Sequence, residues 1–197
     1  MRRLTLPKGS WTFFRQWLRN PARTAAVAPS GRDLAAAMVT ALPDGARRVI
    51  ELGGGTGAIT RALLARGILG RELMVLELNE ELHAHLRARF PQVRIVLGDA
   101  RDLVQLAGAD GYLADGPADA IVSGLGFLGM PRATQREILQ ASFDCLRDGG
   151  RFLQFTYGPQ SPVAAEVAGE LGLEVERGEF VLLNVPPATV YTLRRRV

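Results

Sequence analysis

The fold of this chain is decided by residues 49–57, which read Val49-Ile50-Glu51-Leu52-Gly53-Gly54-Gly55-Thr56-Gly57. An apolar strand leads through an acidic residue into glycines at alternate positions, and an apolar helix follows directly. Because glycine has no Cβ, glycines spaced by two let the backbone approach a bulky ligand and adopt positive φ at little cost. The pattern predicts the first strand, turn and helix of a nucleotide-binding α/β domain.

The glycines do not by themselves name the ligand. Gly53-x-Gly55-x-x-Ala58 also satisfies the looser fingerprint of dinucleotide-binding domains. Glu51, two residues before the first glycine, separates the two interpretations. A carboxylate there is unfavourable beside a pyrophosphate but favourable beside a cation, because like charges repel and opposite charges attract. The sequence therefore favours S-adenosylmethionine, whose sulfonium is positively charged.

Two further apolar runs also end in acidic residues. Residues 73–78 end in Glu77-Leu78, about 20 residues beyond the last glycine, where a ribose-binding carboxylate is expected in such folds. Residues 93–100 form the next run, and Asp99 near its end could accept a hydrogen bond from an adenine amino group. The alternative for each acid is an ordinary helix N-cap.

Length and composition indicate one domain. The chain has 197 residues, a single cysteine and no Pro/Ser-rich linker, which suits a reducing compartment. No apolar run is long enough to span a bilayer, and no signal peptide is recognisable. The two histidines, His83 and His85, point to different faces of a predicted helix, so no metal site is expected.

Basic residues are concentrated at the two ends of the chain. Seven precede the first acidic residue, Asp33, and Arg194, Arg195 and Arg196 lie near the end. Those ten cations leave 14 basic against 20 acidic residues in the middle, a net charge of −6. Such an excess of arginine indicates a phosphate-bearing partner, which could be nucleic acid or anionic lipid.

Residues 10–19 predict an amphipathic helix that begins at Ser10 and ends before Asn20-Pro21. At 100° per residue its rings and aliphatic side chains share one arc and its arginines the other. The apolar arc contains Trp11, Phe13, Phe14, Trp17 and Leu18, and the polar arc contains Thr12, Arg15, Gln16 and Arg19. This arrangement is typical of a helix that lies in a membrane interface, with guanidinium groups on lipid phosphates. The alternative is a helix that covers its own domain as a lid.

The rest of the chain predicts alternating strands and helices, and hence a mostly parallel sheet of seven strands covered on both faces. The last two strands are too close in sequence for a crossover helix, so we expect an antiparallel hairpin there. Strands are predicted near 48–52, 72–77, 93–97, 119–123, 151–157, 173–182 and 188–194. Helices are predicted near 30–41, 57–66, 80–89, 131–146 and 162–171. We therefore divide the chain into N-terminal helices (1–42) and a Rossmann-like cofactor-binding unit (43–197).

The reacting group is expected beyond the fourth and fifth strands. Ser123 ends the fourth, Phe127 follows it, and Tyr157 follows the fifth. The two rings could border an ammonium group through their π faces, or could simply pack in the core. The Asp/Asn/Ser-Pro-Pro-aromatic tetrad of enzymes that methylate planar amines is missing, which weighs against a nucleobase substrate.

Five motifs, in the same order, resemble bacterial phospholipid N-methyltransferases, a family of class I S-adenosylmethionine-dependent enzymes. They are residues 13–21 (FFRQWLRNP), 26–31 (AVAPSG), the glycine motif, 122–125 (VSGL) and 154–158 (QFTYG). More distantly the chain is similar to ribosomal RNA adenine dimethyltransferases, which leaves an RNA methyltransferase as the alternative function. One departure from the phospholipid family is Gly126, where its motif has proline.

The resemblance implies stepwise methylation of phosphatidylethanolamine, through mono- and dimethyl forms, to phosphatidylcholine, with S-adenosylhomocysteine as the second product. It implies a cytoplasmic enzyme docked by its N-terminal helix on the anionic inner membrane, with no nucleic-acid or metal partner. By the family motif Glu51 and the three glycines hold the methionine part, Glu77 the ribose and Asp99 the adenine. The full set of expected cofactor contacts is Ser30, Glu51, Gly53, Gly55, Gly57, Glu77, Leu78, Asp99, Ala100 and Ser123. Ser123, Phe127 and Tyr157 are expected to position the amine, whose proton acceptor is unassigned. Expected membrane contacts are Trp11, Phe14, Arg15, Trp17, Leu18 and Arg19.

Overall fold

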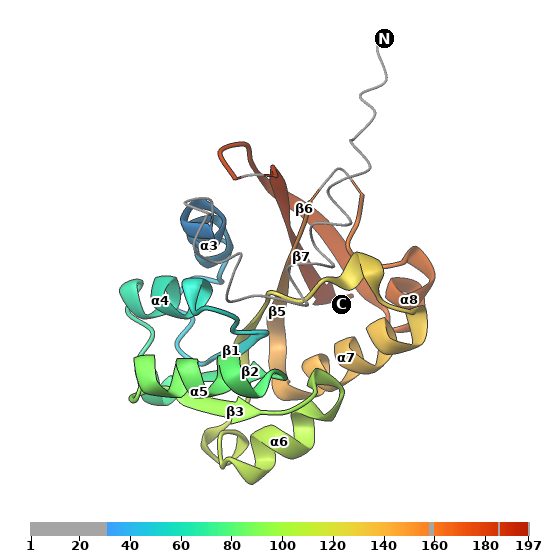
Figure 1. The fold of residues 1–197 in the computed structure, drawn as a ribbon. Helices are drawn as coiled ribbons and strands as arrows, with labels where there is room; N and C mark the ends of the chain where they lie inside the picture. The colour runs from blue at the N-terminus through green and yellow to red at the C-terminus, as the bar shows by residue number, and fades with distance from the viewer. Residues whose placement is uncertain (1–30, 158–159, 185, 197) are drawn as a thin grey trace.

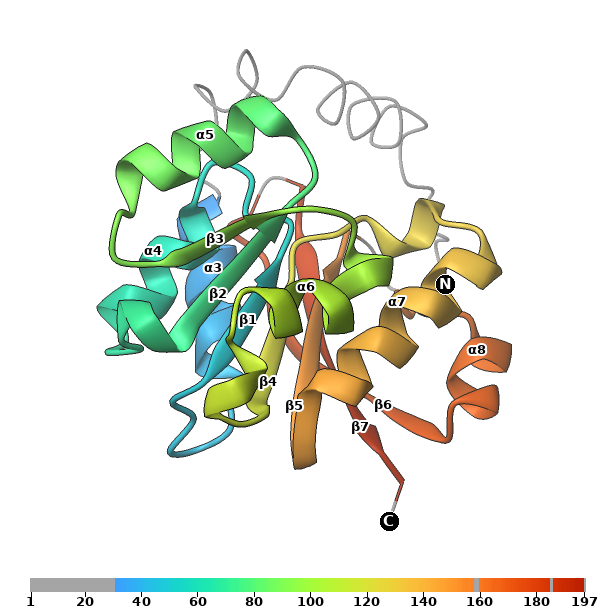
Figure 2. The same ribbon diagram turned by 90° about the horizontal axis from the view of Figure 1, so that it is seen from below.

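The computed structural model describes residues 31–157, 160–184 and 186–196. In this part a seven-stranded sheet carries helices on both faces, as Figures 1 and 2 show. The strands are β1 (Val49–Leu52), β2 (Leu73–Glu77), β3 (Arg94–Leu97), β4 (Ala118–Ser123), β5 (Leu146–Thr156), β6 (Leu173–Val181) and β7 (Ala188–Arg195). The α-helices are α3 (Gly31–Thr40), α4 (Ala58–Ala65), α5 (Glu80–Arg89), α6 (Leu103–Ala109), α7 (Arg132–Cys145) and α8 (Ala165–Glu170). Short 3-10 turns are η1 (Gly70–Glu72), η2 (Ala100–Asp102), η3 (Leu113–Asp115) and η4 (Phe127–Gly129).

The strand order is β3-β2-β1-β4-β5-β7-β6. Strands β1 to β5 are parallel, while β7 runs antiparallel to both β5 and β6. The carboxyl ends of β1 to β6 therefore share one edge of the sheet, which we call the carboxyl edge, and the opposite edge is the amino edge. This confirms the predicted fold class: a mostly parallel Rossmann-like sheet with a C-terminal antiparallel hairpin.

Each face of the sheet has its own apolar core. One core joins the sheet to α3, α4 and α5 through residues such as Met38, Leu63 and Leu86. The other joins it to α6, α7 and α8, with Phe152 near its centre. Strands β1 and β2 are buried along their whole length, which explains why they read as continuous apolar runs rather than as alternating patterns.

The predicted elements agree with the structure apart from two differences. Helix α6 was not predicted, because its seven residues end in Ala107-Gly108-Ala109 and make too few turns to show a period. Strand β5 begins at Leu146, five residues earlier than expected: Leu146 pairs with Ala118, and Arg151 pairs with Ala120, so the intervening residues bulge out of the ladder. Gly149 has a φ of 70° in that bulge, a backbone region that glycine adopts at little cost.

The N-terminal predictions are tested only in part. Helix α3 agrees with the prediction at 30–41, and it packs into the core beside the sheet through Leu34, Met38 and Val39. The amphipathic helix at 10–19, Ser30 and the six membrane contacts lie outside the described residues. The division of the chain at residue 42 remains a prediction.

Candidate active site

The glycine loop between β1 and α4 lies at the carboxyl edge. Gly53, Gly55 and Gly57 all have positive φ, at 74°, 53° and 81°. The loop is fastened to β2, because the Gly53 N–H donates to the carbonyl of Leu76 over 2.8 Å. A loop of this kind needs glycine, since other residues adopt this backbone region only at a cost.

The three glycines have different neighbours. A Cβ on Gly53 would lie 2.9 Å from Leu125 Cδ2, and one on Gly57 would lie 2.4 Å from Phe90 Cε2, so both positions serve close packing. A Cβ on Gly55 would meet no described atom closer than the carbonyl oxygen of Gly53, at 4.0 Å. Gly55 therefore borders open space where a ligand can approach the backbone.

Glu51, on β1 just before this loop, is completely buried. The Thr60 hydroxyl donates to its Oε2 over 2.6 Å, while Oε1 has no hydrogen-bond partner among the described residues. Burial raises the pKa of Glu51 to about 8, so without a ligand the carboxyl is mostly protonated at pH 7. A cation beside it would favour the ionised form, and a buried oxygen without a partner fits a positively charged ligand.

Glu77 ends β2 and faces the same loop. Its Oε2 accepts from the Gly55 N–H over 2.8 Å, and its Oε1 accepts from the Asn79 N–H over 2.9 Å. These bonds fix the carboxylate while leaving lone pairs on both oxygens. The next side chain, Leu78, is 67% exposed and stands free at the rim. The ribose contact assigned to Glu77 remains a prediction.

Asp99 has the N-cap role that the sequence left open. Its Oδ1 accepts from the Arg101 backbone N–H over 2.9 Å, which caps the η2 turn that begins at Ala100. The Arg101 guanidinium also donates to both carboxylate oxygens, at 3.1 and 2.8 Å. These hydrogen bonds to Arg101 hold the pKa of Asp99 below its usual value. The adenine contact therefore remains a prediction. Asp99 would make that contact in addition to its ion pair with Arg101.

The end of β4 packs directly on the glycine loop. The Gly124 N–H donates to the Leu52 carbonyl over 2.8 Å, and a Cβ on Gly124 would lie only 2.9 Å from the Gly53 carbonyl oxygen. Ser123, the last residue of β4, is buried and accepts at Oγ from the Leu125 N–H over 3.3 Å. The structure thus brings Ser123, which the sequence analysis placed at the end of the fourth strand, beside the cofactor loop.

The two predicted aromatic residues differ in their surroundings. Phe127 is 1% exposed and packs edge-on against Phe152 with ring centroids 5.8 Å apart. This is the packing role that the sequence left open, and the contact of Phe127 with the amine remains a prediction. Tyr157 is half-buried at the end of β5 and lies edge-on to Phe155. Burial raises the pKa of Tyr157, although a hydrogen bond to Asn184 opposes this, so a phenolate is unfavourable there.

Gln154 is a site residue that the sequence analysis did not identify. It is fully buried on β5 and pairs in register with Ser123. Its Nε2 donates to the carbonyls of Leu125 and Phe155, both over 2.8 Å, and its Oε1 has no partner within the described part of the chain. An amide within the apolar run from Phe152 to Phe155 was the available signal, but only the structure shows that one oxygen is unpaired.

Comparison with known proteins agrees with this geometry. A model of the methyltransferase domain matches residues 49–150, which is more than half of the chain. The chain is also 33% identical over 191 residues to an ornithine lipid N-methyltransferase of Singulisphaera acidiphila, covering 95% of this chain and 96% of that protein. The chain belongs to the class I S-adenosylmethionine-dependent methyltransferases. Its cofactor is accordingly S-adenosylmethionine, as the glycine loop and Glu51 predicted.

Two more comparisons concern a part of this methyltransferase and its fold. A ribosomal RNA small subunit methyltransferase A of a Synechococcus species is 37% identical over 92 residues, but the match covers only 44% of this chain and 29% of that protein. The solved structure of the glycopeptide N-methyltransferase MtfA with S-adenosylhomocysteine aligns with a TM-score of 0.63 at 17% identity, covering 90% of this chain and 98% of that one. At that identity the likeness concerns the fold alone.

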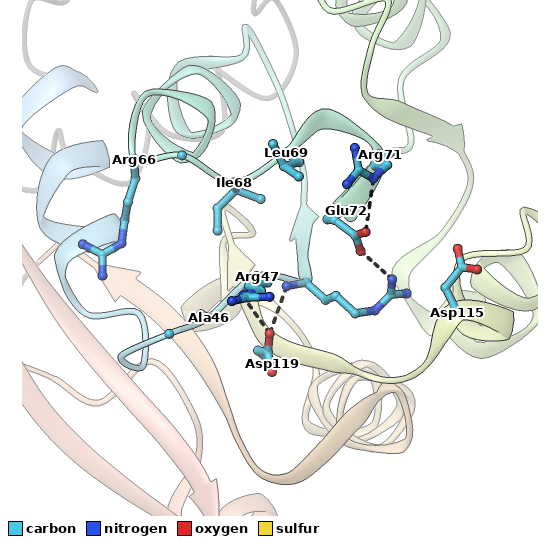
Figure 3. Close-up of a pocket in the computed structure, with 12 residues that line it drawn as sticks. Ala46, Arg47, Arg66, Ile68, Leu69, Arg71, Glu72, Asp115 and Asp119 are labelled. Atoms are coloured by element: carbon cyan, nitrogen blue, oxygen red, sulfur yellow. Dashed lines mark hydrogen bonds and ion pairs between the residues drawn. The ribbon is translucent and has the colours of Figure 1, made fainter.

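A cavity of about 940 Å³ lies at the amino edge, away from the methyltransferase's glycine loop (Figure 3). Arginines and acids line it together (Figure 3), and the Arg47 and Arg48 backbone N–H groups donate to Asp119, at 2.8 and 2.9 Å. The Arg48 side chain forms an ion pair with Glu72 at 2.6 Å. These contacts tie the starts of β1, β2 and β4 together, so we regard the cavity as structural.

The described residues contain neither a candidate metal site nor a candidate membrane-spanning helix. Within residues 31–157, 160–184 and 186–196, no group of histidine, cysteine and acidic side chains could hold a metal ion. No helix in the same part of the chain is long and apolar enough to cross a membrane.

Proposed function

We propose that this methyltransferase methylates the primary amine of a membrane lipid headgroup, and that it converts phosphatidylethanolamine stepwise to phosphatidylcholine. The observation that carries the proposal is the 33% identity, over nearly the whole of both chains, to an enzyme whose name specifies lipid N-methylation. The family motifs of the sequence analysis support the same substrate class.

The cofactor supplies a methyl group already activated on a sulfonium, so the protein mainly has to hold and orient the reactants. In the proposed site Gly55 lets the cofactor approach the backbone, and Glu51 stabilises its positive charge. Glu77 is placed to accept from the ribose hydroxyls, with Leu78 beside it as an apolar contact. Asp99 and Ala100 would meet the adenine.

The amine would enter between the ends of β4 and β5. Gln154 Oε1 is an unpaired acceptor there, and Ser123 is its neighbour across the strands. An oxygen acceptor can hold the amine through its N–H groups while the nitrogen lone pair points at the methyl group. Because the pKa of Tyr157 is raised, we assign it to positioning, with the amine proton passing to water.

Ornithine lipid is the second candidate substrate. The relative with the full-length match carries that name, and ornithine offers a primary amine as phosphatidylethanolamine does. RNA is a weaker candidate, because the match to the ribosomal RNA enzyme covers less than half of this chain. The C-terminal arginines also give less support to an RNA substrate than the sequence suggested. Arg194 pairs with Glu174 and Arg195 with Asp144, so their charges are partly neutralised.

The proposed location is the cytoplasmic face of the inner membrane. Residues 10–19 would bind there, with Trp11, Phe14, Trp17 and Leu18 in the interface and Arg15 and Arg19 on lipid phosphates. The C-terminal arginines lie at the end of β7, at the amino edge, so only the N-terminal cations share this role.

The direct test offers one radiolabelled methyl donor to three acceptors. Vesicles with phosphatidylethanolamine, vesicles with ornithine lipid, and unmethylated ribosomal RNA are incubated separately with the protein and methyl-labelled S-adenosylmethionine. We expect label in chloroform-extractable mono-, di- and trimethylated lipid from the first sample. Label in the second sample alone would show that ornithine lipid, and not phosphatidylethanolamine, is the substrate. Label in RNA alone would overturn the proposal.

A further inference from the structure

The large apolar side chains that remain exposed are distributed unevenly over the molecule. Six of the seven found in the described residues lie at the carboxyl edge, where the cofactor loop also lies. They are Leu78, Leu97, Leu128, Phe180, Leu182 and Leu183. The seventh, Leu69, lies at the amino edge just before η1. A soluble protein has no need of such a gathering unless that edge meets an apolar partner.

Half of this set belongs to the tip of the β6–β7 hairpin, which we define as Phe180, Leu182 and Leu183. They are 51%, 68% and 78% exposed. Figure 1 shows the hairpin extending beyond α3. Leu78 follows β2, Leu97 ends β3 and Leu128 follows β4, so all three lie around the cofactor site, where a bound cofactor would cover some of their surface. The hairpin tip has no such role in the proposed function.

The tip is a built feature of the hairpin. Val181, between two exposed residues, is 6% exposed and packs in the core, and Ala188 at the start of β7 is fully buried. Asn184 is 2% exposed, and its Nδ2 donates to the Pro186 carbonyl over 2.7 Å. The turn is therefore anchored from inside while its largest apolar side chains point outward, so little conformational freedom is lost when a partner covers them.

The tip is also free of charge. From Phe180 to Leu193 the sequence contains no acidic or basic residue. Burial of this stretch in a hydrocarbon environment would therefore remove no ion from water, which is the main cost of inserting protein segments into bilayers. A protein partner of ordinary polarity would not require a stretch without charged residues.

The base of the tip connects to the reaction edge. Asn184 forms a hydrogen bond with Tyr157, which follows β5. The β5–β7 pairing continues up to Thr156 and Thr189, so the hairpin rises from the wall of the proposed amine site. A surface that covered the tip would lie directly over the entrance for the amine.

We propose that the hairpin tip inserts into the lipid bilayer and seats the carboxyl edge on it, so that a lipid amine reaches the cofactor without leaving the membrane. The inference rests on the proposed lipid substrate, and it adds a second membrane contact to the predicted helix at 10–19. The two contacts differ in physical origin. The helix carries arginines whose attraction to phosphate is screened by salt, whereas burial of the tip is apolar and insensitive to salt.

The first experiment uses a double variant that combines Leu182→Ser and Leu183→Ser. Its control is Leu69→Ser at the amino edge. Binding to anionic vesicles is measured by sedimentation at low and high salt. Each leucine that no longer enters the bilayer should weaken binding roughly tenfold, so we expect a loss of about 100-fold in the double variant at both salt concentrations. Leu69→Ser should bind like the unchanged protein.

The same variants separate this inference from the proposed function. With vesicles as substrate, the double variant should transfer methyl groups more slowly, and with the same lipid dispersed in detergent it should match the unchanged protein. Unchanged vesicle binding would overturn the inference whichever lipid is methylated. A failure to methylate any lipid, with vesicle binding lost in the double variant, would overturn the proposed function and leave the membrane contact standing.

A second experiment reports the position of the tip itself. The only tryptophans are Trp11 and Trp17, so Leu183→Trp in a Trp11→Phe, Trp17→Phe background carries a single indole at the tip. We expect vesicles to shift its emission to the blue and brominated lipid chains to quench it. Emission that ignores vesicles, or that shifts only as the protein concentration rises, would show that the N-terminal segment or a second copy covers the tip, and would overturn the inference.

Discussion

The two edges of the sheet differ in how far their polar side chains are hydrogen-bonded. At the amino edge Asp119 accepts from the backbone of Arg47 and Arg48 and pairs with Arg147 at 2.6 Å, and only Nε of the Arg48 side chain lacks a partner. At the carboxyl edge Glu51 and Gln154 are both fully buried, and each keeps one oxygen without a partner among the described residues. The amino edge has the cavity of about 940 Å³, and Glu72 and Asp119 in its lining are both paired with arginines.

This difference shows that an open volume is a poorer guide to function than an unmet bonding requirement. A buried acceptor without a donor costs free energy in the empty protein, and a ligand that supplies the donor recovers it. The amino edge has little to recover by binding. The carboxyl edge has two such acceptors within one layer of strands, and its acid has a raised pKa, which is typical of functional sites.

The largest expected effect compares two glycines, one at each edge. Gly55 and Gly67 both have positive φ, and neither has a described atom closer than about 4 Å to a built Cβ. Alanine at either position should cost roughly 1–2 kcal/mol in stability from backbone strain. Gly55→Ala should also weaken S-adenosylmethionine binding at least 100-fold, because its methyl group occupies the space for the ligand.

Calorimetric titration of both variants measures this difference. Gly67→Ala should bind the cofactor with the affinity of the unchanged protein. Equal losses in the two variants would mean that strain, and not the position of Gly55, is responsible.

The second effect concerns the stability of the cofactor-free protein between pH 6 and pH 8. The pKa of Glu51 is about 8 in the folded state against 4.5 in the unfolded chain, so in this window the folded state holds a proton that the unfolded state has released. Stability should therefore fall as the pH rises, by about 2 kcal/mol from this group. Urea unfolding of Glu51→Gln should lack this decrease; parallel curves for the two proteins would contradict the assigned pKa.

The sequence predicted the local features of this site well. Residues 49–57 predicted a strand, turn and glycine loop because each step depends on neighbouring residues. The position of Ser123 at the end of the fourth predicted strand then indicated that it would lie near the reacting group. By contrast, the unpaired oxygen of Gln154 and the exposure of the hairpin tip depend on residues far apart in the chain. Asp99 could not be assigned from the sequence, since its position at the end of the third strand fits an adenine contact and an N-cap equally well.

Membrane binding offers the next comparison, between the two basic ends of the chain. Arg15→Gln with Arg19→Gln removes cations of the predicted helix and should weaken binding to anionic vesicles by about 1 kcal/mol for each lost charge at low salt. The matched control, Arg194→Gln with Arg195→Gln, changes arginines that pair with acids at the amino edge and should bind normally. Vesicle sedimentation at low salt decides between them, and equal losses would mean that both ends touch the membrane.

The smallest effect is expected at Tyr157. Tyr157→Ala should lower turnover about tenfold, the lower end of what a positioning group contributes, while cofactor affinity is retained. Tyr157→Phe, which keeps the ring, should recover most of the turnover. Turnover that is unaffected in both variants would remove Tyr157 from the amine site.

The central claim is that Glu51 meets a cation, and proton release on cofactor binding tests it most directly. S-adenosylmethionine is titrated into the protein at pH 7 in two buffers of different ionisation enthalpy, so that the heat reports the protons released. Relative to Glu51→Gln, which cancels the proton changes of the cofactor itself, the unchanged protein should release about 0.9 proton, as a pKa of about 8 requires, and bind at least tenfold more tightly. Equal proton release and equal affinity in the two proteins would contradict the account.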